Sequence, residues 1–249
     1  MDIDYPEVRM KKLLLLALST LILVLPATAL AVPTTLGDIL GWEGTDAYKD
    51  TGAEYVMLTD TDGTKDDVTA FLLLELAGYD GQNTLGIYGF TTDGDNVILG
   101  NTLEVFKGTD SAIKSVTLQF NLLDGTVTKS STNESAKIGT SFGFYITTPE
   151  GADTTYYTHQ VLNKDGFDHF LLFDTSDNSV DDLWGSDVVL AIEDLFGGGD
   201  RDYNDMVAGV SDVSPAPVPE PATMLLLGTG LIGLAGMGRK KLSKKDPTA

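Results

Sequence analysis

Six side chains with oxygen donors fall within one short stretch, residues 193–205. They are Glu193, Asp194, Asp200, Asp202, Asn204 and Asp205. The last three even-numbered positions, 200, 202 and 204, place an oxygen at every second residue, a spacing by which a tight loop can turn successive side chains toward one cation. The glycines at 197–199 allow the backbone to fold closely enough to add carbonyl ligands. The pattern indicates a cation site.

Calcium suits this donor set best. It accepts about six to eight oxygen ligands in flexible geometry, whereas zinc, copper and iron call for His or Cys. The chain has two His and no Cys. The stretch is not an EF-hand, because Asp205 stands where that loop needs Gly and Ser211 where it needs a bidentate Glu. The alternative is a solvated acidic turn, whose carboxylates would repel one another unless a cation or Arg201 offset them.

Two further motifs have simpler interpretations. Residues 60–67 begin with an Asp-x-Asp-Gly sequence that resembles half of a calcium loop, but a polar loop before Val68 explains them better. Residues 139–143 match the G-x-S-x-G nucleophile pattern around Ser141. That motif requires a strand followed by a helix, and residues 142–147 are instead typical of a strand. No metal site or nucleophile is predicted at either place.

An enzymatic function is weakly supported. Only His159 and His169 could act as general bases, and the apolar run after His169 indicates a strand. Carboxylate pairs of the kind used by glycoside hydrolases are uninformative in so acidic a chain. No catalytic residue is therefore predicted. The alternatives that stay open are a polysaccharide-active hydrolase or lyase, and a lectin-like module.

A lectin would need aromatic side chains that stack on sugars, although core packing is their commoner use. The candidates are Trp42, Trp184, Tyr156 and Tyr157.

The elements that position the acidic stretch are predicted to be strands, because short apolar or alternating runs are separated by Gly, Asp, Asn and Thr clusters. The candidates are residues 54–58, 85–88, 102–106, 115–122, 141–147, 155–158, 169–173, 188–193 and 205–210. Nine strands at this spacing favour an all-β fold, a jelly-roll-like β-sandwich. The run at 68–79 fits a strand or a short helix, and the Pro- and Ser-rich residues 211–217 indicate a linker.

The beginning of the chain, residues 1–31, has the features of a secretory signal peptide. A basic pair follows Met10, an apolar run covers residues 13–25, and Ala29 and Ala31 supply the small residues of a signal-peptidase site. The acidic residues before Met10 are atypical of such a signal. Translation is therefore expected to start at Met10, with a longer natural leader as the alternative.

The end of the chain combines three features in order. A Pro-Glu-Pro triplet is followed by an apolar run at 222–238 and a basic tail at 239–245. The run would form a helix about 25 Å long, near the thickness of a bilayer core, with the basic tail on the cytoplasmic side. A buried helix is the alternative, but the run has no polar face. The residues of this signal are Pro219, Glu220, Pro221, Arg239, Lys240 and Lys241.

These C-terminal residues resemble the PEP-CTERM sorting signal of exopolysaccharide-producing bacteria. The resemblance implies transient anchoring in the inner membrane, cutting near the triplet by an exosortase, and release to the cell envelope, extracellular matrix or medium. Residues 32–213 would then form the folded domain, and residues 214–249 the linker and sorting signal.

The mature region, residues 32–219, is strongly acidic. It has eight Lys and Arg against thirty-two Asp and Glu, a net charge of −24, compared with −21 for the whole chain. Such a surface repels nucleic acid and attracts divalent cations. Without Cys, the domain cannot rely on disulfides, and a bound metal could fix loops instead.

The acidic stretch and the segments before it resemble the domain of unknown function 4114. The matching motifs lie at residues 143–145, 157–163, 168–170 and 191–207, so the similarity covers about residues 138–210. It implies a secreted β-rich domain with a calcium loop and no established catalytic activity. The six oxygen-bearing residues would be its acidic motif, with Asn163, Asp168 and His169 nearby. Together these features predict an exported calcium-binding structural or adhesive protein of the cell surface or biofilm matrix, with anionic exopolysaccharide as a partner.

Overall fold

The computed structural model describes residues 36–40, 50–61, 63–75, 81–110, 114–150, 154–177 and 184–218. All of them belong to one unit, Thr35–Ala249. The expected signal peptide, residues 1–31, and the expected membrane helix, residues 222–238, lie outside this described part. Within it, no helix is long and apolar enough to cross a bilayer.

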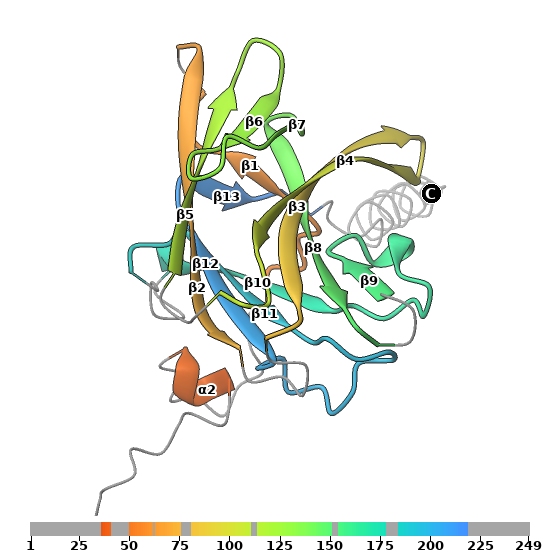
Figure 1. Cartoon of the computed structure of the whole chain (residues 1–249). Helices are drawn as coiled ribbons and strands as arrows, with labels where there is room; N and C mark the ends of the chain where they lie inside the picture. The colour runs from red at the N-terminus through yellow and green to blue at the C-terminus, as the bar shows by residue number, and fades with distance from the viewer. Residues whose placement is uncertain are drawn as a thin grey trace, which may run out of the picture. The chain divides into compact units, whose positions relative to one another are not determined.

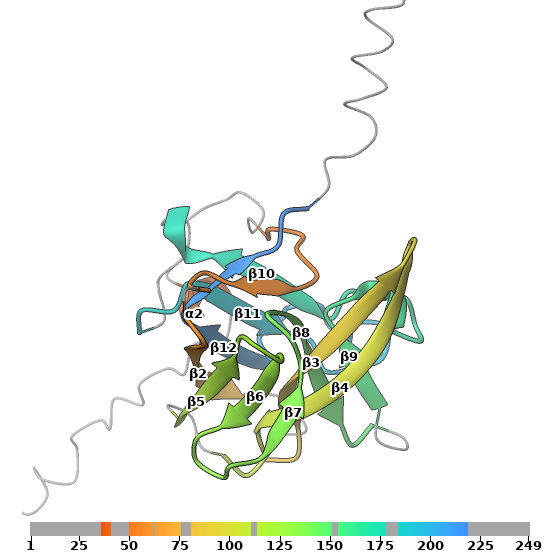
Figure 2. The same ribbon diagram turned by 90° about the horizontal axis from the view of Figure 1, so that it is seen from above.

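Two antiparallel sheets make up the described structure (Figure 1). The first contains β1 (Val56–Leu58), β3 (Thr84–Asp93), β4 (Asn96–Phe106), β8 (Ser141–Thr148), β9 (Thr154–Tyr157) and β13 (Val213–Pro215). Its order is β13-β1-β8-β3-β4, with β9 paired to β8. Seen from above, the β3–β4 hairpin extends beyond the neighbouring strands (Figure 2).

The second sheet supplies the strands around the acidic loop. It contains β2 (Lys65–Glu75), β5 (Lys114–Asn121), β6 (Thr126–Lys129), β7 (Ser135–Lys137), β10 (Phe170–Asp174), β11 (Val188–Ile192) and β12 (Met206–Val210). Its order is β10-β11-β12-β2-β5-β6-β7. Strand β11 therefore lies between β10 and β12, and the loop that joins β11 to β12 leaves from one end of this sheet.

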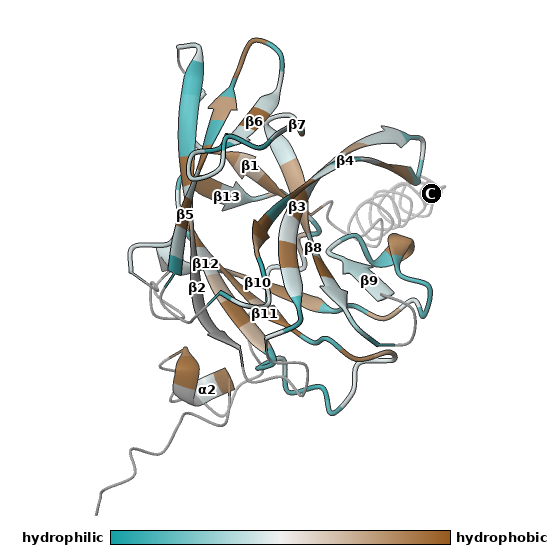
Figure 3. Cartoon of the chain, viewed as in Figure 1, coloured by the Kyte–Doolittle hydropathy of each residue, from teal (hydrophilic) through white to brown (hydrophobic). Residues whose placement is uncertain are grey.

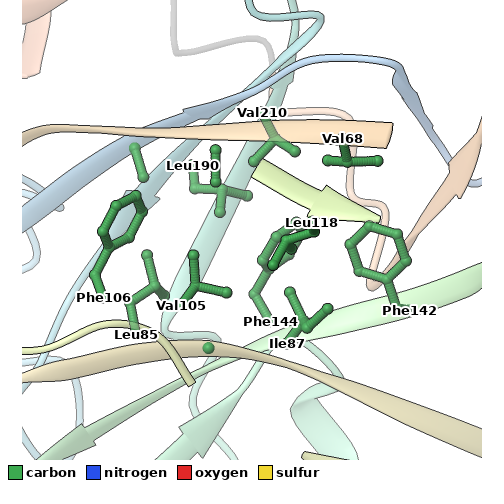
Figure 4. A pocket seen from close by; sticks show the side chains of 13 residues that line it. Val68, Leu85, Ile87, Val105, Phe106, Leu118, Phe142, Phe144, Leu190 and Val210 are labelled. Carbon is green, nitrogen blue, oxygen red and sulfur yellow. The ribbon is translucent and has the colours of Figure 1, made fainter. Parts of the chain in front are cut away.

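The two sheets share one hydrophobic core. Along β5 the buried residues alternate, so that Val116, Leu118 and Phe120 lie on one face. They belong to the same buried cluster as Ile87 of β3 and Phe144 of β8, and Figure 4 shows side chains of both sheets around a cavity of about 10 Å³. Alternation of this kind is expected where one face of a sheet is covered.

Strands β11 and β12 are buried along their whole length, as their continuous apolar sequences predict. Their second face is covered by helix α2 (Leu36–Ile39) and the following turn, because Leu36 and Leu40 share a cluster with Val189, Ala191 and Val207. Figure 3 shows hydrophobic residues on both strands and hydrophilic residues at the start of β2. Cover on both faces fixes the two strands that carry the acidic loop.

The prediction of an all-β fold is confirmed, and each of the nine candidate strands overlaps a strand of the structure. The undecided run at 68–79 begins as part of strand β2. Because β2 starts at Lys65, Asp66 and Asp67 lie in a strand and not in the expected polar loop. Strands β6 and β7 are not predicted from the sequence, since they are short and largely polar.

The assignment of residues 211–217 to a linker is wrong for its central part. Strand β13 pairs with β1, with Val213 opposite Leu58 and Pro215 opposite Val56. Val213 and Ala216 are buried. Pro and Ser suggest a linker because they disfavour regular structure locally, but here the partner strand lies far earlier in the chain. The folded domain therefore extends past residue 213 to Ala216.

Candidate metal centre

The acidic loop connects two neighbouring strands of the second sheet. Strand β11 ends at Ile192, and β12 begins directly after Asp205. A bridge between Ile192 and Asn204 holds the two ends of the loop together. The N–H of Glu193 donates to the carbonyl of His169, just before β10, at 3.0 Å. The sheet therefore fixes both ends of the loop but not its middle.

Five carboxylates of the loop converge in two groups. One oxygen each of Glu193, Asp200 and Asp202 lies within 4.8 Å of the others. The same holds for Glu193, Asp194 and Asp205. Glu193 belongs to both groups, so it is the centre of the cluster. These five residues are called the carboxylate cluster below.

Glu193 is fully buried, and within the described part of the chain neither oxygen of its carboxylate accepts a hydrogen bond of good geometry, although the N–H of Tyr203 lies near enough to oppose the rise of its pKa. Burial and the negative charge of Asp205 raise the pKa of Glu193 to about 8. Burial also raises the pKa of Asp194 to about 6, although a hydrogen bond from Asn83 opposes the shift. A buried, ionised carboxylate without a counter-charge costs several kcal/mol, roughly. The cluster is therefore suited to hold protons or a cation.

Three glycines let the loop close against this cluster. Residues 197–199 all have positive φ, at 71°, 79° and 37°. A Cβ at Gly198 would overlap the Phe167 ring, and one at Gly199 would overlap Oε1 of Glu193. A side chain at either position would have to displace the ring or the carboxylate, and the positive φ would add backbone strain.

Hydrogen bonds orient the other carboxylates. Asn83, just before β3, donates from Nδ2 to Oδ2 of Asp194 at 2.7 Å, and the N–H of Asp194 donates to Oδ2 of Asp205 at 3.0 Å. Asn204 donates from Nδ2 to Oδ2 of Asp202 at 2.7 Å. Because Asn83 precedes a strand of the first sheet, the cluster lies where the ends of the two sheets meet.

Arg201 does not neutralise the cluster. Its guanidinium lies 5.1 Å from the centroid of the Phe167 ring and donates to the carbonyl of Gly197 at 3.5 Å. Among the described residues it forms no ion pair with a carboxylate of the cluster. Arg201 therefore does not offset the repulsion between the carboxylates, which the sequence left open.

A buried histidine supports the loop from the side of β10. Nδ1 of His169 lies 2.8 Å from the carbonyl oxygen of Glu193, and Nε2 lies 3.0 Å from Oδ2 of Asp165. Asp165 also accepts the N–H of Gly197 at 2.8 Å. Although burial opposes it, two backbone hydrogen bonds, that of Gly197 first, lower the pKa of Asp165. The Tyr156 ring stacks on the imidazole with centroids 3.6 Å apart.

A family model described as Domain of unknown function (DUF4114) matches residues 120–211, and one described as PEP-CTERM protein-sorting motif matches residues 217–240. The chain thus has a segment similar to DUF4114, followed by a PEP-CTERM motif. No curated protein and no solved structure matches the chain. The PEP-CTERM motif marks a secreted protein that an exosortase processes at the membrane and that ends up at the cell surface or outside.

The DUF4114 match begins earlier than the resemblance indicates, at residue 120 and not near 138, and so includes β6 and β7. Within it, β8 pairs with β3 and β12 pairs with β2, both of which lie before residue 120. The strands before the matched segment therefore complete both sheets to which the segment contributes.

The six residues of the acidic motif do not all play the same part. Five form the carboxylate cluster, and Asn204 contacts it through Asp202. Of the residues that the resemblance places nearby, His169 contacts the loop directly. Asp168 also contacts the loop, because its carbonyl accepts the hydroxyl of Tyr203 at 2.8 Å. Asn163 instead holds its own turn, accepting the N–H of Tyr157 at 2.7 Å.

Three residues that contact or surround the acidic loop are not indicated by the sequence. They are Asn83, Asp165 and Glu150, whose Oε2 accepts the N–H of Phe196 at 2.9 Å. Asp165 is visible in the sequence only as half of an Asp-Gly turn, four residues before His169. For Asn83 and Glu150 the sequence carries no signal, since both lie far from the loop in the chain.

The remaining motifs do not join the cluster. Ser141 opens strand β8, so the helix that a nucleophile elbow requires does not follow it. Nδ1 of His159 lies 2.6 Å from the hydroxyl of Tyr88. Trp184 is 50% exposed. Several predicted residues lie outside the described part: Ala29, Ala31, Trp42, Pro219, Glu220, Pro221, Arg239, Lys240 and Lys241.

Proposed function

We propose that this protein is an exported calcium-binding structural or adhesive component of the bacterial cell surface or exopolysaccharide matrix. The observation that supports this most is Glu193, which is fully buried, accepts no hydrogen bond of good geometry at either oxygen among the described residues, and lies at the centre of four more carboxylates. A buried acid in such surroundings is stabilised by a bound cation.

The donor chemistry favours calcium over other metals. All five converging groups are carboxylates, and spacings of up to 4.8 Å between their oxygens suit a cation with ligand distances of about 2.3–2.6 Å. The nearest imidazole, that of His169, already has both nitrogens within hydrogen-bond distance of oxygens. At the millimolar calcium found outside cells, a dissociation constant of about 10⁻⁴ to 10⁻³ M would suffice.

The role that we infer for calcium is mechanical and adhesive. The cluster joins the end of β11 to the start of β12, and Asn83 links it to the first sheet. A bound ion would fix these ends together in a chain that has no disulfides. Exposed ligands such as Asp200 would let the same ion contact anionic polysaccharide.

The route to the surface that we infer begins with a signal peptide, residues 1–31, cut by signal peptidase after Ala31. The jelly-roll-like domain would fold outside the inner membrane while the helix at 222–238 and the basic tail at 239–245 anchor it. The exosortase would then release it to the envelope, the matrix or the medium.

A lectin-like module is the second candidate. Phe196 lies in the acidic loop and is 61% exposed, so a sugar could stack on it beside a bound ion. A hydrolase or lyase would need two carboxylates that face an open groove. The complete burial of Glu193 argues against that use of the cluster.

Calcium titration of the full-length protein by calorimetry tests the proposal, together with thermal melts in calcium and in chelator. Asp200→Ala/Asp202→Ala should weaken binding and reduce the rise in Tm. The matched control is Asp93→Ala/Asp95→Ala, which removes two exposed acids from the β3–β4 turn and should behave like the wild type. No binding at millimolar calcium, or equal loss in the control, would refute a specific site.

A further inference from the structure

Building on the proposed function, we propose that the carboxylate cluster binds two calcium ions, bridged by the carboxylate of Glu193. An outer ion would lie between Glu193, Asp200 and Asp202, and an inner ion between Glu193, Asp194 and Asp205. The two groups of converging oxygens have only Glu193 in common.

The two oxygens of Glu193 allow this division. Both are buried and accept no hydrogen bond of good geometry in the described structure. Oε1 faces Gly199, since a Cβ at that glycine would overlap it, and Gly199 directly precedes Asp200. On this ground we assign Oε1 to the outer ion and Oε2 to the inner ion. A carboxylate can bridge two cations in this way because each of its two oxygens has lone pairs available.

The inner group is held in place before any ion binds. Asn83 occupies Oδ2 of Asp194, and the N–H of Asp194 occupies Oδ2 of Asp205. These bonds fix the two carboxylates through one oxygen each, so that Oδ1 of each is the atom for a cation. Asp194 is also buried, which makes the inner group the more enclosed of the two.

The charge of the cluster also favours two ions. Five carboxylates carry five negative charges when ionised, and Arg201 pairs with none of them in the described structure. One calcium ion would leave three of these charges uncompensated around a buried glutamate. A second calcium ion would leave one negative charge uncompensated, and solvent can screen that charge at the exposed Asp200 side of the cluster. The repulsion that remains after the first ion therefore favours binding of the second.

The test is to count calcium bound per chain at saturation. Full-length protein is titrated with calcium chloride alone by calorimetry, and the count is checked by equilibrium dialysis. The wild type should bind two equivalents. Asp200→Asn/Asp202→Asn and Asp194→Asn/Asp205→Asn should each retain one, Glu193→Gln should lose both, and the surface control Asp93→Asn/Asp95→Asn should retain two.

The outcomes separate this inference from the function on which it rests. One equivalent in the wild type would overturn the two-ion arrangement and leave calcium binding intact. No equivalents would overturn both. Loss of an equivalent in the surface control would also overturn the arrangement, because the count would then report diffuse binding to an acidic surface. The wild-type count decides the matter even if the Glu193 variant does not fold, which near-ultraviolet circular dichroism would reveal.

Discussion

Oδ2 of Asp165 lies 3.0 Å from Nε2 of His169, and both side chains are almost completely enclosed, at 3% and 0% exposed. The other ring nitrogen faces the carbonyl of Glu193. The Glu193 carbonyl and an ionised Asp165 carboxylate can only accept hydrogen bonds. Both contacts can therefore be hydrogen bonds only if both ring nitrogens carry a proton, or if Asp165 itself is protonated. The pair thus links the turn before β10 to the acidic loop.

Replacing His169 by Phe should destabilise the domain by about 3 kcal/mol or more. Phe keeps an aromatic ring against Tyr156 but removes the imidazole from the buried Asp165 carboxylate, which then has only the N–H donors of Phe167 and Gly197. The matched control is His159→Phe, at the other histidine of the chain. That change removes a bond to the neutral Tyr88 hydroxyl and should cost only about 1 kcal/mol. Urea unfolding measures both, and equal losses would contradict the interpretation.

The pH dependence of stability should include a contribution from Asp168. Burial, together with the charges of Asp50 and Glu54, raises its pKa to about 6, against a hydrogen bond from the N–H of Phe170. Because the pKa is higher in the folded state, the stabilisation is complete below about pH 4 and is lost as the pH rises through about 6. Asp168→Asn should remove this loss and stabilise the protein at pH 7 by about 1 kcal/mol.

Asp174→Asn is the matched control for that experiment. Asp174 accepts the N–H of Ser176 two residues on, as Asp168 accepts that of Phe170. Thermal melts between pH 4 and 8 should show a gain that grows with pH for Asp168→Asn, and Asp174→Asn gives the baseline for an Asp-to-Asn change of the same local geometry. A gain that is independent of pH would rule out the ionisation of Asp168 as its cause.

The glycines of the acidic loop should differ sharply in their tolerance of Ala. Gly197 and Gly198 have similar positive φ, but a Cβ at Gly197 would meet nothing within 4 Å, whereas one at Gly198 would overlap the Phe167 ring. Gly197→Ala should cost about 1 kcal/mol from its backbone alone, and Gly198→Ala about 3 kcal/mol. Chemical unfolding measures both, and comparable costs would show that the ring moves aside easily.

The extension of the domain past residue 213 predicts a contrast between two valines. Val213 is 1% exposed, and Val218 is 48% exposed. Val213→Ala should destabilise the domain by about 2 kcal/mol, and Val218→Ala should change its stability by less than about 0.5 kcal/mol. If the unfolding free energy is the same for both variants, β13 contributes little to the fold.

Structural features that depend on residues close together in the chain can be predicted from the sequence. Contacts between residues far apart in the chain cannot. The apolar runs of β11 and β12 indicate two buried strands, and the oxygen spacing between them indicates where carboxylates gather. The pattern does not reveal that Asn83 reaches Asp194, because that contact spans 111 residues. Strand β13 is missed for the same reason: Pro and Ser describe its local preference, and its partner β1 decides its conformation.

Strand β13 also sets how much room the processing enzyme has. The N–H of Ala216 still donates to the carbonyl of Tyr55, and only two residues, Pro217 and Val218, separate it from Pro219. Even a fully extended chain spans no more than about 11 Å over that distance. An exosortase that acts at the triplet would therefore have to work within about 11 Å of a folded protein surface. Its access would depend on the bulk of the domain as well as on the motif.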